Sequence, residues 1–292
     1  MLGRVLALTV MSIVGCAKGG SNTVTIIDAD DGDDADTDAP SRRHPDTPPA
    51  QQGQKLLLTE ISLAPSPGEF VEILNPNATD VSLSNYYLSD HSSYFKLPAG
   101  VPTVDTGDFL VQFPATASIP AKSVATIAIS TAADFTTTYP GIDPSFSIGA
   151  GTNQMTIVAS NGVATLTNAG EMVALFFWDG ESDVVQDCDL MLAGVPTAAN
   201  SLVTKTGVQQ DGPDADMVTT AYANDALTIA PQPTEPASGK STKRIALEAG
   251  NQLANGNGNG VDGDDESSEN TAMTWDTTYT APTPGQVPIA LQ

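Results

Sequence analysis

Cysteine and histidine, which most often carry nucleophilic or metal chemistry, are scarce in this chain of 292 residues, with two of each. An apolar run, residues 5–14, follows Arg4, and Cys16 stands two residues after its end. The run is too short to cross a bilayer, which takes roughly 20 apolar residues, but it fits the hydrophobic region of a secretory signal. Gly15 supplies the small residue that a signal peptidase needs before its cut. We therefore predict that residues 1–15 are a signal peptide.

The segment that ends in Cys16, Ile-Val-Gly-Cys, resembles the bacterial lipobox Leu-(Ala/Ser)-(Gly/Ala)-Cys. The resemblance implies a diacylglycerol thioether on Cys16, cleavage before it and acylation of the new N-terminus. Stable anchoring takes more than one acyl chain, so we expect attachment to a membrane through Cys16. Ala17 is not the aspartate associated with inner-membrane retention, so the outer membrane is the expected location. The alternative is an ordinary secretory signal.

The remaining cysteine and histidines offer little material for catalysis. Cys188 has no partner once Cys16 is acylated, and the flanking Asp187 and Asp189 disfavour its thiolate. His44 falls in a linker-like segment, so neither a Ser-His-Asp triad nor a multi-histidine zinc site can be assembled. We therefore expect no enzyme activity, no cofactor and no bound metal, with an unusual hydrolase as a remote alternative.

The charge balance also excludes one class of partner. The chain carries 35 acidic and 11 basic residues, a formal net charge of −24. Nucleic-acid binding depends on Lys and Arg neutralising phosphates, so nucleic acid is not an expected partner.

Composition divides the chain after the signal peptide. Residues 16–53 are Gly/Ser-, Asp- and Pro-rich, and we predict a disordered acidic tether there. Residues 54–292 alternate short apolar runs with turn residues, a pattern typical of an all-β sandwich. Three stretches read as insertions in this domain, namely residues 98–118, 190–238 and 251–270.

Several strands can be placed within the domain. We expect one face of the first strand to carry Leu57, Thr59, Ile61 and Leu63, and further strands at 70–74, 81–88, 123–129 and 172–178. Asn161-Gly162 lies between two strand-like runs, 155–160 and 163–167, and predicts a tight hairpin.

The order of short motifs along the domain resembles that of bacterial lamin tail domains. Six segments match in order: Thr59-Glu60-Ile61, Phe70–Asn75, Val81–Asp90, Leu166–Leu175, Gly239–Arg244 and Thr283–Gly285. The resemblance implies an immunoglobulin-like β-sandwich of the lamin-tail type. In bacteria such domains accompany secreted nucleases, hydrolases and adhesin-like proteins as non-catalytic appendages, so the resemblance implies a role class and no more.

A candidate calcium loop lies at Asn255–Glu266, where Asn257, Asn259 and Glu266 occupy EF-hand-like positions. Asn255 replaces the first aspartate, and Asp262 stands where an EF-hand has an apolar residue. A different calcium loop using Asp262, Asp264 and Glu266 stays open, against the alternative of a solvated loop.

Two further groups of residues could carry a function. Glu60 and Glu72 could form a glycosidase pair, but strand alternation predicts that Glu60 faces solvent. An exposed strip of aromatic residues could stack on sugars; its members would be Tyr86, Tyr87, Trp178 and Trp275.

These observations predict a lipid-anchored envelope protein whose sandwich is a non-catalytic structural, adhesion or protein-interaction module. The alternative is a carbohydrate-binding surface module. The expected partners are the membrane, through Cys16, and envelope proteins or glycans.

Overall fold

A computed structural model describes residues 53–151, 153–168, 170–194, 203–224, 237–247, 258–263 and 265–292. The predicted signal peptide, Cys16 and nearly all of the tether lie outside these residues, so their predictions stay predictions. No helix in the described part of the chain is long and apolar enough to cross a membrane.

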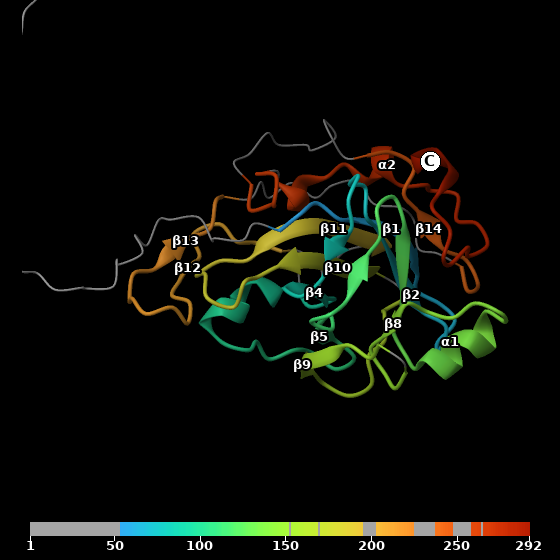
Figure 1. The fold of residues 1–292 in the computed structure, drawn as a ribbon, viewed down its shortest axis with the longest axis horizontal. Helices are drawn as coiled ribbons and strands as arrows, with labels where there is room; N and C mark the ends of the chain where they lie inside the picture. The colour runs from blue at the N-terminus through green and yellow to red at the C-terminus, as the bar shows by residue number, and fades with distance from the viewer. Residues whose placement is uncertain are drawn as a thin grey trace, which may run out of the picture. The chain divides into compact units, whose positions relative to one another are not determined.

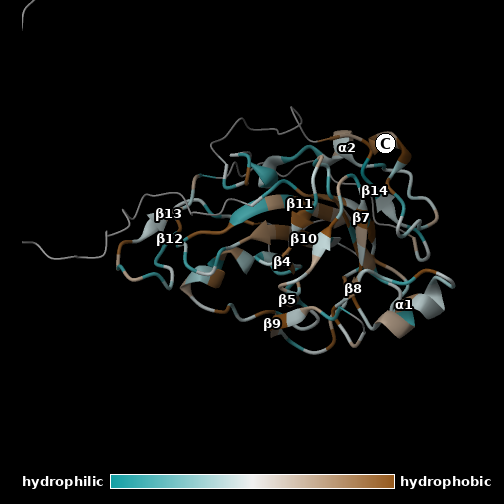
Figure 2. Cartoon of the chain, in the orientation of Figure 1, coloured by the Kyte–Doolittle hydropathy of each residue, from teal (hydrophilic) through white to brown (hydrophobic). Residues whose placement is uncertain are grey.

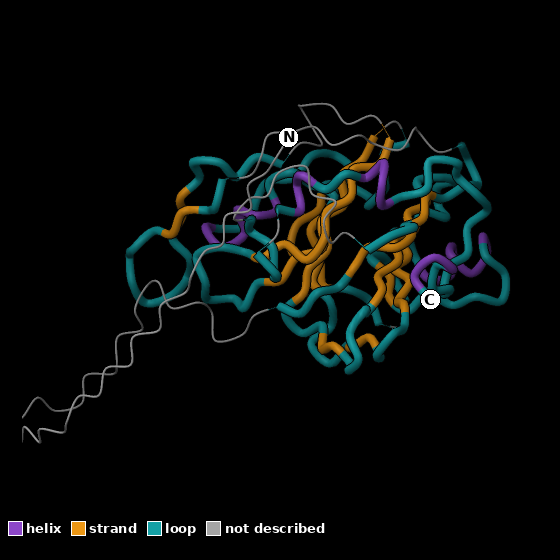
Figure 3. The backbone as a smooth tube through the Cα atoms, turned by 90° about the horizontal axis from the view of Figure 1, so that it is seen from above, coloured by secondary structure: helices purple, strands orange, loops and turns teal. Residues whose placement is uncertain are grey.

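The described residues form an all-β sandwich of two five-stranded sheets (Figure 1). The first sheet has the order β14-β1-β2-β7-β8 and the second has the order β11-β10-β4-β5-β9. Seen from above, the strands fall into two groups that face each other (Figure 3). All neighbours are antiparallel except β7 and β8.

The strands are short, and their bounds are β1 Leu57–Ser62, β2 Phe70–Leu74, β3 Val81–Ser82, β4 Tyr86–Ser89, β5 Phe109–Gln112, β6 Ser118–Ile119, β7 Val124–Ala128, β8 Phe146–Ser147, β9 Thr156–Ser160, β10 Gly170–Phe177, β11 Gln186–Gly194, β12 Gln209–Gln210, β13 Thr220–Ala221 and β14 Thr242–Lys243. The helical segments are η1 Tyr94–Ala99, α1 Ala132–Thr138, η2 Glu266–Ser268, α2 Thr271–Thr274 and η3 Ile289–Leu291.

Three apolar layers hold these elements together. The main core lies between the sheets and includes side chains from β1, β2, β7, β10 and β11, together with Trp275. A second cluster covers the outer face of the second sheet, where η1 and Tyr222 contact it. A third places Phe135 of α1 against Phe70. Figure 2 shows the apolar character of β10, whose two faces contact two of these layers.

The first strand differs from the prediction in its inward face. The inward residues are Leu56, Leu58, Ile61 and Leu63, because a register shift between Leu58 and Glu60 places two successive residues on the outer face. Such a bulge inserts one residue into the alternation. A period-two pattern read from the sequence therefore places only the C-terminal half of this strand correctly.

Two other predicted strands also differ. The single strand expected over 81–88 is two short strands, since β3 pairs with β6 and β4 lies in the second sheet. The hairpin at Asn161-Gly162 is absent, because β9 pairs with β5 and residues 163–167 form no strand. Gly162 does have the positive φ of 91° expected for a turn.

Parts of the expected insertions belong to the sandwich. The segment 98–118 contains β5, which lies between β4 and β9. The segment 190–238 begins inside β11, the strand that pairs along the length of β10. In both cases an apolar run that forms a strand is adjacent to turn-rich sequence. The boundary between the strand and the insertion therefore cannot be located from the sequence.

Candidate functional site

The two strand carboxylates, Glu60 and Glu72, lie directly opposite each other on β1 and β2 and are fully buried. They occupy the outer face of the first sheet, as alternation predicted, but the prediction that Glu60 faces solvent is wrong. The chain returns over this face near its C-terminus. Thr283 donates to Glu60 through its backbone N–H (2.8 Å) and its hydroxyl (2.9 Å), and the Gly285 N–H donates to Glu72 (2.6 Å).

The hydrogen bonds to Glu60 and Glu72 connect distant segments of the chain, so both carboxylates have a structural role. Ser241 donates a hydrogen bond of 2.6 Å to Glu60, and Thr126 donates one of 3.1 Å to Glu72. Burial, with a smaller contribution from the charge of Glu60, raises the pKa of Glu72 to about 8. Since both carboxylates are fully buried and their donors come from the chain's own segments, the geometry does not resemble a glycosidase site.

Arg244, the last residue of the fifth matched segment, is buried where β1, β11 and the C-terminal segment meet. Its guanidinium is fully buried and donates to Leu58 O (2.7 Å), to Asp189 (2.6 Å) and to Glu269 (2.7 Å). Its planar fork also lies over the Trp275 ring, 5.0 Å from the centroid. These contacts join β1, β11 and the C-terminal segment, so Arg244 is a structural anchor.

Cys188 lies among apolar side chains, whereas the aspartates on either side of it lie in ion pairs. Cys188 is buried in the core between the sheets, as expected for a structural cysteine. Asp187 is paired with the buried Lys205 and accepts a hydrogen bond of 2.7 Å from the Tyr94 hydroxyl. The two aspartates flanking Cys188 are thus engaged in buried ion pairs rather than in activating a nucleophile.

The aromatic residues proposed for sugar stacking do not form an exposed strip. Tyr86, Tyr87 and Trp275 are buried, and Trp178 is half-buried with its indole N–H donated to Ser182 O. Tyr87 stacks on Phe176 in the layer outside the second sheet. These side chains fill cores, which removes the feature that would have favoured a glycan platform.

The Asn255–Glu266 loop is described only in part, because Asn255, Asn257 and Asp264 lie outside the described residues. Asp262 forms an ion pair of 3.3 Å with Lys55. Asn259 exchanges hydrogen bonds with Ala223 and its side chain does not point outward as a free ligand. Calcium binding by this loop stays a prediction, and two of its oxygen donors, on Asn259 and Asp262, have partners within the chain.

Two groups of ionisable side chains lie close enough to share a cation. In the first, His91 accepts a hydrogen bond at Nδ1 from Ser93 N, which leaves the proton on Nε2, near Asp108. That tautomer does not offer Nε2 to a metal. In the second, Asp183 accepts hydrogen bonds from Gly212 N and the Thr220 hydroxyl. Acidic groups of this kind are common without a metal, so we assign none.

A cleft of about 470 Å³ opens on the side of the sandwich where the edge strand β9 and the residues after β8 approach each other. Its lining consists of Ser66, Pro67, Ile129, Ser130, Thr131, Asp134, Ile148, Gly149, Ile157, Ser160, Gly162, Val163, Ala164 and Thr165. The volume lies within the range of small-molecule sites, about 300–1,000 Å³. The cleft is therefore large enough to hold a small molecule.

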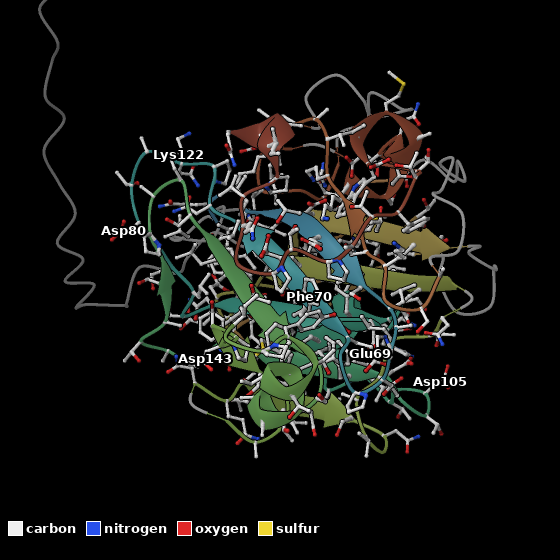
Figure 4. The ribbon with its side chains drawn as sticks, turned by 90° about the vertical axis from the view of Figure 1, so that its right-hand side faces the viewer. Glu69, Phe70, Asp80, Asp105, Lys122 and Asp143 are labelled. Atoms are coloured by element: carbon white, nitrogen blue, oxygen red, sulfur yellow. The ribbon has the colours of Figure 1, made fainter. Side chains whose placement is uncertain are left out.

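Glu69, at the start of β2, lies behind the cleft wall. Figure 4 shows Glu69 and Phe70 within the body of the fold, whereas Asp80, Asp105 and Asp143 lie at its edges. Burial raises the pKa of Glu69, and the nearby hydroxyls of Ser66 and Thr165, both in the lining, act against that rise. The Glu69 carboxyl therefore lies next to the cleft, because Ser66 and Thr165, which line the cleft, are its neighbours.

Comparison with known protein families gives a match over the N-terminal part of the sandwich. Residues 49–186 match the family model of the Lamin Tail Domain. The match supports the immunoglobulin-like β-sandwich of lamin-tail type that the sequence predicted, and it covers just under half of the chain. Domains of this kind are typically non-catalytic, which is consistent with a structural or interaction module.

No curated protein matches the chain. The lamin-tail match ends at Gln186, where β11 begins, so β11, Arg244 and the segment over Glu60 and Glu72 lie beyond it.

Sequence reasoning identified the motif residues but not their roles, and it missed the cleft. The roles of Arg244, Glu60 and Glu72 depend on contacts across more than 180 residues of sequence. The sequence resemblance offered one signal for the C-terminal pairing, since it placed Gly239–Arg244 and Thr283–Gly285 in the same predicted domain as β1 and β2. The cleft is lined by five separate segments and has no local signature.

Proposed function

We propose that the protein is a lipoprotein of the bacterial envelope, anchored through Cys16, whose lamin-tail-type sandwich acts as a non-catalytic structural, adhesion or protein-interaction module. The observation that carries the non-catalytic part is the use of the buried motif side chains. Glu60, Glu72 and Arg244 bind the chain's own segments, and none of them lines the cleft.

The anchoring part rests on the lipobox-like sequence that ends in Cys16 and on the charge-rich segment that follows it. A segment with this many aspartates would extend through like-charge repulsion. It would hold the sandwich away from the lipid surface, where its faces are accessible to other envelope components. The outer membrane is the proposed location.

The anchor is tested with the full chain and its Cys16→Ala variant in a bacterial host supplied with a labelled fatty acid. We expect label on the wild-type chain, its recovery in the membrane fraction, and loss of both in the variant. Cys188→Ala serves as the matched control, because Cys188 is buried in the sandwich and should accept no lipid. Recovery of the Cys16→Ala chain in the membrane fraction would contradict the proposed anchor.

The interaction part is tested by crosslinking on intact cells that display the full chain. A module of this kind should give defined crosslinked products that need the folded sandwich. The Arg244→Met variant, compared at a temperature at which circular dichroism shows its sandwich unfolded and the wild-type sandwich folded, keeps the anchor but not the fold. Products that persist unchanged with that variant would argue against a role of the sandwich.

A further inference from the structure

The cleft beside β9 has mostly apolar walls. Pro67, Ile129 and Ile148 line it from the first sheet and its loops. Ile157 and Val163 line it from the second sheet, and their side chains are 50% and 80% exposed. Apolar side chains so open to water gain from a ligand that covers them, at roughly 25 cal/mol per Å² of area buried.

Two buried polar groups at this cleft have unused hydrogen-bonding capacity. The Ser130 hydroxyl, in the lining, has no hydrogen-bond partner among the described residues. Glu69, directly behind the lining, is only 2% exposed; the Ser66 and Thr165 hydroxyls lie near its carboxyl, but its Oε2 has no hydrogen-bond partner within the described part of the chain. A buried polar atom without a partner costs about 1–3 kcal/mol. A ligand that donates hydrogen bonds to these atoms would recover part of that cost.

The charges around the cleft have one sign. The lining residues include Asp134 but no lysine, arginine or histidine, and Glu69 adds a second carboxyl behind Ser66 and Thr165. Asp134 accepts a hydrogen bond from Thr131 that fixes its position at the start of α1. An anion would therefore be repelled here, whereas a group with N–H donors and a positive charge would be attracted.

We propose that this cleft binds a small organic amine, with the apolar body of the ligand against Ile129, Ile148 and Ile157 and its ammonium group directed to Glu69 and the Ser130 hydroxyl. The site is separate from Cys16, so the inference goes beyond the proposed function and does not depend on the anchor. It adds a chemical class of ligand to a fold that carries no assigned ligand.

The test compares three probes that share a six-carbon body: hexylamine, hexanol and hexanoate. The protein is the full chain with Cys16→Ala, so that no acyl group competes for the apolar walls. Binding is measured by titration with ligand-observed NMR. We expect hexylamine to bind at least about tenfold more tightly than hexanoate, a difference of about 1.4 kcal/mol, with hexanol between them.

Two variants locate the site. Glu69→Gln should weaken hexylamine about tenfold and leave hexanol unchanged, because it removes the carboxylate and keeps the shape. Asp143→Asn, an exposed position outside the lining, changes the net charge equally and should alter neither affinity. Ser160→Tyr, on the exposed face of β9, should fill the cleft and abolish binding of both probes, and it replaces Glu69→Gln if that variant does not fold.

Three outcomes would overturn the proposal. The first is hexanoate binding as tightly as hexylamine, and the second is hexylamine affinity unchanged by both Glu69→Gln and Ser160→Tyr. The third is absence of binding by every probe at millimolar concentration. None of them bears on lipid attachment, which is measured independently.

Discussion

At the scale of single residues, the ionisation of Glu72 is coupled to folding, because burial raises the pKa of its carboxyl to about 8. Below pH 4.5 its carboxyl is protonated in both the folded and the unfolded chain. Between pH 4.5 and about 8 the unfolded chain has released the proton that the folded chain retains. Rising pH therefore favours unfolding through this range, by roughly 1.4 kcal/mol for each pH unit, and the loss ends above about 8.

This predicts that Glu72→Gln flattens the pH dependence of stability. Glutamine keeps one acceptor oxygen, which can take the place of Oε2 beside the Thr126 hydroxyl and the Gly285 N–H, but it does not ionise. The wild-type chain should lose more of its free energy of unfolding between pH 5 and pH 8 than the variant does, as measured by urea unfolding at each pH. Other buried carboxylates titrate in both proteins, so the difference isolates Glu72. Parallel curves would show that Glu72 is ionised throughout.

Residue identity alone could predict the face of Glu60 and Glu72 but not their burial. Alternation along β1 and β2 places both on the outer face of the first sheet, where a sandwich strand usually meets water. What covers them is the segment at Thr283–Gly285, more than 200 residues later in the chain. No local pattern carries that information. For Cys188, in contrast, the flanking aspartates already argued against a reactive thiol, and the side chain is buried in the core.

At the scale of elements, the C-terminal segment completes the first sheet. Besides its bonds to Glu60 and Glu72, it pairs with the chain near β14 through Ser241 and Thr280. β14 is only two residues long, so it covers little of β1 by itself. The segment thus protects a pair of buried carboxylates that would otherwise lack several of their donors.

Removal of residues 282–292 should therefore destabilise the sandwich strongly. Glu60 loses both donors on Thr283 and Glu72 loses the Gly285 N–H. We expect a loss of about 3 kcal/mol or more in the free energy of unfolding, since each unsatisfied buried group costs about 1–3 kcal/mol. Removal of residues 286–292 alone is the matched control, because it retains Thr283 and Gly285, and it should cost much less. Equal losses from the two truncations would contradict this role.

The strands could be predicted where the sequence pattern is uninterrupted, and they were mispredicted where a bulge or a change of sheet interrupts the pattern. β2, β7 and β10 match the predicted strands, because β-branched, aromatic and other apolar residues dominate each of them. β1 contains a bulge, and the predicted strand over 81–88 divides between two sheets. Turn chemistry at Asn161-Gly162 was identified correctly, but the strand pairing around it depends on β5. Local propensity cannot choose between a neighbour in sequence and a distant partner.

At the scale of the whole molecule, the core extends well past the region matched by the lamin tail family. Cys188, Met191 and Ala193 of β11 and the distant Trp275 all belong to the cluster between the sheets. β11 pairs with β10 over its length, and its Asp189 is bound by Arg244. A family match that ends at Gln186 therefore leaves β10 without its outer neighbour and the core without part of its filling.

It follows that a fragment of residues 43–186 should not fold, whereas residues 43–292 should unfold in one cooperative transition. The shorter fragment exposes Val173, Leu175 and the rest of β10 along an unpaired edge, which favours aggregation over folding. Circular dichroism during heating, with sedimentation to detect aggregates, distinguishes the two.

A variant of the longer fragment with Arg244→Met provides an intermediate case, because it keeps β11 but leaves Asp189 and Glu269 without their buried cation, at a cost of about 3–5 kcal/mol. A cooperative thermal transition in the 43–186 fragment would instead show that the matched region is an independent domain, with β11 and the C-terminal segment added to it rather than required by it.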